Sequence, residues 1–160
     1  MNSIIQRFVR TSDLTPEQTW QLVMWCAERG GDEFSVRLLR SGDHLASAHS
    51  RFREGLAEFH RGKASRECVT NQVGAKSRNS TEIWQCCPES IEKLHRFFPD
   101  GVLAAPSYAE EGWFEDFIIY RRGEIMCGVV SHEEIALLRL ADLEYRELSE
   151  RSIKSHETAI

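Results

Sequence analysis

The stretch that decides the fold runs from Trp113 to Arg151 and reads WFEDFIIYRRGEIMCGVVSHEEIALLRLADLEYRELSER. Phe114 to Tyr120 is dense in aromatic and β-branched residues, and Ile125 to Val130 is again apolar. Two such runs joined by a few residues that include glycine indicate a β-hairpin. Gly123 comes third in the connection, where a type I turn followed by a left-handed residue and a bulge requires glycine. We therefore expect a central hairpin with apolar residues on both of its faces.

The hairpin is followed by Ser131-His132-Glu133-Glu134, which fits the capping box of a helix. The rest of the stretch has no Gly or Pro and repeats apolar residues at helical spacing, so we favour one long helix from Ser131 onward. The alternative makes Ile135 to Leu140 a third strand that turns back at His132, with Asp142 capping a shorter helix.

The first half of the chain predicts alternating strands and helices. Thr15 at the N-cap, Pro16 at the first helical position and Gln18 at the third form a complete helix start, and Gly30-Gly31 ends that helix. The predicted elements are a strand at 3–9, a helix at 16–29, a strand at 33–40 and an amphipathic helix from His44.

Between the halves, Lys63 to Ser80 is polar and basic, which predicts a long mobile surface loop that could contain a short strand at Cys68 to Gln72. Thr81 to Cys87 is a candidate strand, and Pro88 opens a further helix that ends before Pro99.

These elements together predict an α+β fold, with a mixed or antiparallel sheet of about four to six strands, packed helices and a C-terminal β-hairpin followed by a helix. The length fits a single globular domain over residues 1–154, and residues 155–160 are expected to form a short disordered tail.

Charge and cysteine content indicate where the protein works. Residues 1–80 carry 12 Lys and Arg against 9 Asp and Glu (net +3), whereas residues 81–160 carry 8 against 16 (net −8). The acidic second half disfavours general nucleic-acid binding, which needs a basic surface. Five cysteines, an odd number in a chain of this length, indicate reduced thiols. With no apolar run of membrane-spanning length and no signal-peptide pattern, we expect a cytoplasmic protein without a membrane association.

The strongest acid-base candidate is His132 with Glu133, at the end of a central strand and the start of the expected helix. The competing interpretation is structural, because Ser131 and Glu134 would cap the helix and Glu133 would complement its dipole. On either interpretation these residues mark the end of the hairpin.

A second candidate is the basic loop with Lys63, Arg66, Lys76 and Arg78, which could bind an anion or an acidic partner surface. It has no interleaved aromatic residues to stack on bases, and a solvated surface loop remains the default interpretation. A cluster of carboxylates, Glu110, Glu111, Glu115 and Asp116, could hold a hard cation, but it lacks the ligand spacing of a known cation loop. The sequence predicts no metal site and no cofactor.

The common catalytic signatures are missing, while charge is segregated along the chain. We therefore expect a small protein-binding or regulatory module without catalytic activity. The alternative is a small enzyme with an acid-base site near His132 and Glu133 and an anion-binding loop at 63–78. The sequence leaves the oligomeric state open.

Overall fold

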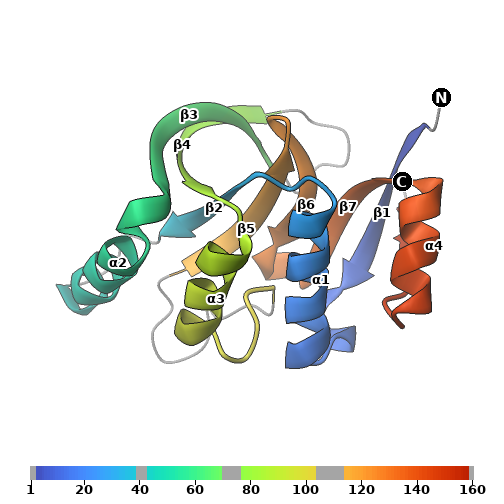
Figure 1. Ribbon diagram of the computed structural model, residues 1–160, viewed down its shortest axis with the longest axis horizontal. Coiled ribbons are helices and arrows are strands. Elements are labelled where there is room, and N and C mark those ends of the chain that lie inside the picture. The colour runs from blue at the N-terminus through green and yellow to red at the C-terminus, as the bar shows by residue number, and fades with distance from the viewer. Residues whose placement is uncertain (1–2, 39–42, 70–76, 104–113, 159–160) are drawn as a thin grey trace.

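The computed structural model describes residues 3–38, 43–69, 77–103 and 114–158, and the side chains of α2 from Ala48 onward. Within these ranges the fold is α+β, with four helices and an eight-stranded antiparallel sheet (Figure 1). The elements are β1 (Ile4–Arg10), α1 (Pro16–Glu28), β2 (Glu33–Leu38), α2 (Asp43–Gly55), β3 (His60–Cys68), β4 (Ser77–Gln85), α3 (Pro88–Phe97), β5 (Phe114–Arg121), β6 (Glu124–Val130), β7 (Ile135–Ala141), α4 (Asp142–Glu150) and β8 (His156–Glu157).

The predicted hairpin is confirmed as β5 and β6, but its turn is shorter than expected. Arg121 pairs with Glu124, so the turn contains only Arg122 and Gly123, at φ 54° and φ 79°. Two consecutive positive φ angles make a type I′ turn, whose twist matches that of the flanking strands. The bulge expected beside the turn lies inside the strands instead, where the pairing register shifts between Ile119 and Tyr120.

The long helix favoured from Ser131 onward is wrong, and the alternative with a third strand is closer to the structure. Ser131–Glu133 is a single 3₁₀ turn, and Glu134 takes a left-handed conformation at φ 54° that leads into β7. The Ser131 hydroxyl is not a helix cap, because it accepts a hydrogen bond from the Asp116 N–H at 2.9 Å. Along β7 buried and half-buried residues alternate, which is the pattern of a strand.

The helix α4 begins at Asp142, and the side chain of Glu144 caps its N-terminus. The Glu144 carboxylate accepts the Ala141 N–H at 2.8 Å, so Ala141 rather than Asp142 is the N-cap. The helices α1 and α3 begin at their predicted prolines, and the Thr15–Gln18 capping box of α1 is complete.

The sheet has more strands than the four to six expected, and its order is β3-β4-β2-β5-β6-β7-β1-β8. The additional strands come from segments that the sequence patterns assigned to a helix, a loop and a disordered tail. β7 lies in the expected helix, β3 lies in the expected loop from Lys63 to Ser80, and β8 pairs with Arg7 and Phe8 of β1 within the segment 155–160 that was expected to be disordered. The possible strand at Cys68 to Gln72 falls mostly outside the described residues.

All four helices pack on one face of this sheet and share one hydrophobic core with it, which includes Trp25, Phe52, Leu94 and Leu148 (Figure 1). The strands β3 and β4 form a two-stranded ribbon that lies on the other face. The strand β4 pairs with β2 only at Phe34↔Trp84 and Glu33↔Gln85, and beyond these pairs the ribbon curves away from the edge of the sheet. The ribbon covers a second, smaller core that contains Tyr120 and Ile125.

Polar and apolar contacts fix the ribbon on the sheet, and those of Glu67 and Val69 reach the strands β6 and β7. Glu67 of β3 accepts hydrogen bonds from Arg139 of β7 at 2.6 Å and from the Ile125 N–H at 3.4 Å. Val69 lies over Gly128, where a Cβ atom would come within 2.4 Å of a Val69 methyl group. Glycine at position 128 therefore permits the close approach of the ribbon. Within the described residues no helix has the length and apolar character needed to cross a bilayer.

Candidate functional site

His132 lies on the 3₁₀ turn after β6, and its partner is not the one expected from the sequence. Its Nε2 lies 3.2 Å from the Oε2 of Glu115, while Glu133 points to solvent with no ion pair. Glu115 is at the start of β5, where its side chain is only 4% exposed, whereas that of His132 is 59% exposed. The hairpin therefore brings together a buried carboxylate and an accessible imidazole.

Three further residues complete what we call the His132 cluster, which consists of Arg37, Glu115, Asp116, Ser131 and His132. Arg37 of β2 lies 3.1 Å from Glu115 and 3.8 Å from Asp116. Asp116, at φ 52°, exchanges hydrogen bonds with Ser131: its N–H donates to the hydroxyl and its carboxylate accepts the Ser131 N–H at 3.1 Å. These paired bonds fix the turn that carries His132, so the imidazole is held against Glu115.

The His132 cluster borders a cavity of about 420 Å³ that opens where β2 and β4 separate. Arg37 and Asp116 line it together with Tyr120, whose hydroxyl donates to the Glu67 carbonyl at 2.8 Å and lies 3.3 Å from the Ser35 hydroxyl. Burial raises the pKa of Tyr120 to about 12, so this phenol stays protonated at neutral pH. A carboxylate that orients an imidazole can support proton transfer, and the cavity beside it has a size typical of ligand sites.

The predicted basic loop is strand in its described parts. Lys63 and Arg66 lie on β3, Arg78 lies on β4, and Lys76 is outside the described residues. Arg66 binds Glu33 through two hydrogen bonds at 2.9 and 3.0 Å, and these bonds raise the pKa of its guanidinium. Arg78 donates to the Ser65 carbonyl at 3.0 Å, so two of these cations are already engaged within the fold.

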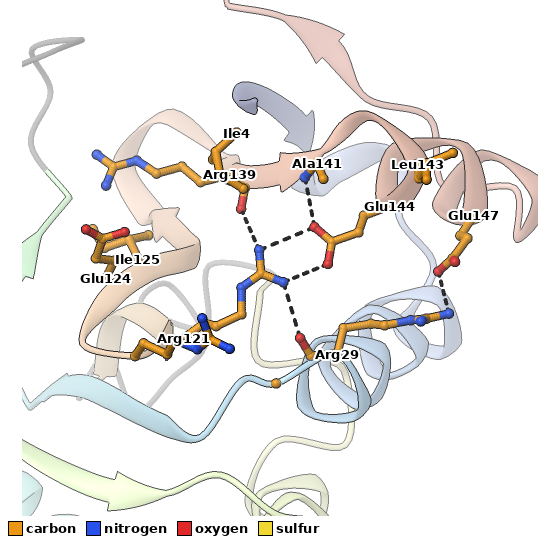
Figure 2. A pocket seen from close by; sticks show the side chains of 12 residues that line it. Ile4, Arg29, Arg121, Glu124, Ile125, Arg139, Ala141, Leu143, Glu144 and Glu147 are labelled. Atoms are coloured by element: carbon orange, nitrogen blue, oxygen red, sulfur yellow. Dashed lines mark hydrogen bonds and ion pairs between the residues drawn. The ribbon is translucent and has the colours of Figure 1, made fainter. Parts of the chain in front are cut away.

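A groove that the sequence did not indicate lies where the hairpin tip, the end of α1 and the start of α4 meet. Figure 2 shows it with Arg121 at its centre, and we call it the Arg121 groove. Its volume is about 680 Å³. The Arg121 guanidinium donates to both Glu144 oxygens, at 2.6 and 3.3 Å, and to the carbonyls of Arg29 and Arg139 at 3.2 and 3.4 Å.

The ionic groups of this groove are largely neutralised by one another. Burial alone would raise the pKa of Glu144, but the hydrogen bonds from Arg121 and the Ala141 N–H outweigh it and lower the pKa below the ordinary value. Arg29 lies 2.6 Å from Glu147 on the rim. The exposed side chains of Arg122 and Glu124, at the hairpin tip, have no such partner within the described residues.

The rim of the Arg121 groove also carries unusual apolar surface. Ile4 at the start of β1 is 59% exposed and Leu143 on α4 is 57% exposed, and no other large hydrophobic residue in the described part of the chain is exposed. Both line this groove, on either side of Ala141, which pairs with Ile4 in the sheet. Exposed apolar residues that border one groove mark it as a candidate interaction surface.

The structure describes only part of the carboxylate cluster that the sequence suggested. Glu115 and Asp116 belong to the His132 cluster, while Glu110 and Glu111 lie outside the described residues. Within the described ranges no three His, Cys, Asp or Glu side chains are placed to hold a metal ion. The comparisons with known proteins found no matching family model, no matching curated protein and no matching solved structure.

Proposed function

We propose that this protein is a small cytoplasmic protein-binding or regulatory module that binds its partner through the Arg121 groove. The observation that carries the proposal is the placement of Ile4 and Leu143, the two exposed large apolar residues of the described chain, on the rim of one groove. Apolar side chains near the centre of an interface contribute most of its binding energy when a partner excludes water from them.

The charged floor of the groove supports the same function. Because Arg121 already holds Glu144 and Arg29 already holds Glu147, a partner can cover these groups without leaving a charge unpaired. Arg122 and Glu124, one cation and one anion on the hairpin tip, remain free to orient the partner at the edge of the contact. A groove with a compensated floor and apolar rim favours binding over catalysis.

The test is site-directed photo-crosslinking in cells that make the protein. A benzophenone amino acid replaces Leu143 in one variant and Glu54 in a control, since Glu54 is exposed on α2, at the opposite end of the molecule from α4 (Figure 1). We expect one protein to be crosslinked from position 143, to be absent from the position 54 sample, and to bind the purified chain directly. Equal capture from both positions, or no direct binding, would refute the proposal.

A second candidate function is a small enzyme that uses His132 as its acid-base group. The specific observation in its favour is the buried Glu115 carboxylate at 3.2 Å from the His132 Nε2, a position from which it could orient the imidazole. The assay is hydrolysis of a panel of p-nitrophenyl esters and phosphates by the purified protein. Activity that falls in both His132→Gln and Glu115→Gln, but not in Glu133→Gln, would support this function, and equal rates for all four proteins would exclude it for these substrates.

A further inference from the structure

A separate basic cavity lies on the other side of α4 from the Arg121 groove. The residues of α4 that line it, Asp142, Tyr145, Arg146 and Ser149, are spaced by three and four and so share one helix face. Arg7 of β1 and the segment Lys154-Ser155, which leads from α4 into β8, complete its wall. We call this the Arg7 cavity, and its volume is about 480 Å³.

Arg7 is the unusual residue of this cavity because it is half-buried and has no anionic partner. Its Nε is buried and makes no hydrogen bond, and no ion pair joins Arg7 to a carboxylate among the described residues. The other half-buried arginines of the fold are each matched: Arg66 by Glu33, Arg121 by Glu144 and Arg139 by Glu67. A buried guanidinium donor without an acceptor is costly, so an unmatched one marks a position where a ligand can supply the acceptor.

The surroundings hold the Arg7 guanidinium in place. It lies over the Tyr145 ring, 4.8 Å from the ring centroid, and the Tyr145 hydroxyl is within 2.8 Å of the carbonyls of Ile5 and Leu138. Desolvation raises the pKa of Tyr145 to about 12, so the phenol adds no negative charge to the cavity at neutral pH. The ring therefore acts as a platform on which Arg7 is oriented before any ligand arrives.

The other ligand-facing groups are complementary to an anion. Lys154 and Arg146 add two positive charges, and Ser149 and Ser155 add two hydroxyl donors. Among the described residues, the only carboxylate in the lining is Asp142, which lies 3.3 Å from Arg146 on the exposed surface. Glu157 pairs with Arg7 in the backbone register of β8, but its exposed side chain forms no ion pair with Arg7 and does not line the cavity. Three cations against one anion leave a net charge of +2.

We propose that the Arg7 cavity binds the phosphate group of a phosphomonoester. Such a group carries close to two negative charges at neutral pH and has three strong acceptor oxygens, which match the net charge and the guanidinium, ammonium and hydroxyl donors of the cavity. A carboxylate has one charge and two oxygens, so it fits less well. The site is independent of the Arg121 groove, since the two share no residue.

The test is a titration of the full chain with inorganic phosphate and with O-phosphoserine in a phosphate-free buffer, followed by NMR. We expect both ligands to shift the Nε–Hε resonance of Arg7 and to bind more tightly than acetate. Because one cation about 4 Å away in water changes affinity roughly fivefold, Lys154→Gln should weaken binding by about that factor. Arg10→Gln is the matched control, since Arg10 is exposed on the same strand and does not line the cavity.

Arg7→Gln should abolish binding, and its thermal unfolding is compared with that of the parent so that loss of the fold is not mistaken for loss of the site. Lys154 is exposed and its replacement leaves the core intact, so it provides a second and independent readout. A phosphoserine-centred peptide that binds more tightly than O-phosphoserine would assign the phosphate to a protein segment, and equal binding would assign it to a small molecule. Saturating phosphate that leaves Arg7 unshifted, or binding that Arg10→Gln weakens as much as Lys154→Gln does, overturns the proposal.

Discussion

Replacing Arg121 by Met should destabilise the fold by about 2 to 3 kcal/mol. A hydrogen bond to a charged group contributes about 1.5 to 3 kcal/mol, and Arg121 makes one short bond to Glu144, at 2.6 Å, and a second at 3.3 Å that is long and adds less. We take the lower part of that range because the two side chains keep 22% and 18% of their surface exposed, where water screens the pair. The bonds to the carbonyls of Arg29 and Arg139, at 3.2 and 3.4 Å, are long and add little. Methionine retains most of the packing of the arginine stem.

The assay is urea unfolding followed by tryptophan fluorescence. Arg146→Met is the control, because Arg146 makes one bond of 3.3 Å to Asp142 between two exposed side chains and should contribute less than about 1 kcal/mol. A double-mutant cycle with Glu144→Gln then isolates the coupling. If Arg121→Met costs no more than the control, or if the two changes are additive, the claim that this pair ties the hairpin tip to α4 is wrong.

Three further predictions concern the same region and the ribbon above it. The pKa of Glu144 is lowered below its ordinary value of 4.5, so its ionised form stabilises the fold above that pH, and this stability is lost as the pH falls through the folded-state pKa. In unfolding measurements at acid pH, the stability of Glu144→Gln should therefore depend less on pH than that of the parent. Gly128→Ala should lower the melting temperature, and adding Val69→Ala should restore part of it, because the new Cβ would lie 2.4 Å from Val69. Arg122→Asn should raise stability in urea by up to about 1 kcal/mol, since asparagine before Gly123 suits a type I′ turn better than arginine at φ 54°.

Elements with local signals were predictable from the sequence. The Thr15-Pro16-Gln18 start of α1, the proline at the start of α3 and the apolar runs of the hairpin act over a few residues, and the structure has each of them. In these segments local propensity and tertiary packing agree, which is what makes a local pattern informative.

The misassigned segment after Val130 shows where local signals fail. Ser131 and Glu134 match a capping box in sequence, but the Ser131 hydroxyl instead accepts a hydrogen bond from the N–H of Asp116, fifteen residues earlier. The competing hydrogen bond depends on the hairpin register, which no local pattern contains. The polar β3–β4 ribbon was missed for a related reason, since the contacts that place it on the sheet, such as Glu67 with Arg139 and Arg66 with Glu33, join residues far apart in the sequence.

The candidate sites were the least predictable part because they form between distant segments. His132 meets Glu115 at the open end of the hairpin, where β5 begins and β6 ends, and Arg121 meets Glu144 across a further strand. Arg7 and Lys154 line one cavity although they lie far apart in the sequence. Sequence reasoning paired His132 with its neighbour Glu133 because adjacency is all that a linear pattern shows. Ile4 stands beside Ile5 in an apolar strand pattern, so its exposure was not predictable, whereas Leu143 lies between Asp142 and Glu144 and off the helix face of Tyr145 and Leu148.

The most direct test of the central claim is the affinity of the partner captured at position 143 for the purified chain and for its Leu143→Asp variant. Leu143 is 57% exposed, so the substitution leaves the fold intact, and a circular dichroism spectrum and a urea melt verify this. A buried aspartate at the centre of an interface should cost at least about 2 kcal/mol, a roughly thirtyfold loss of affinity, whereas Glu54→Lys on α2 should change it less than about twofold. If Leu143→Asp binds as tightly as the parent chain, the Arg121 groove is not the binding surface of this protein.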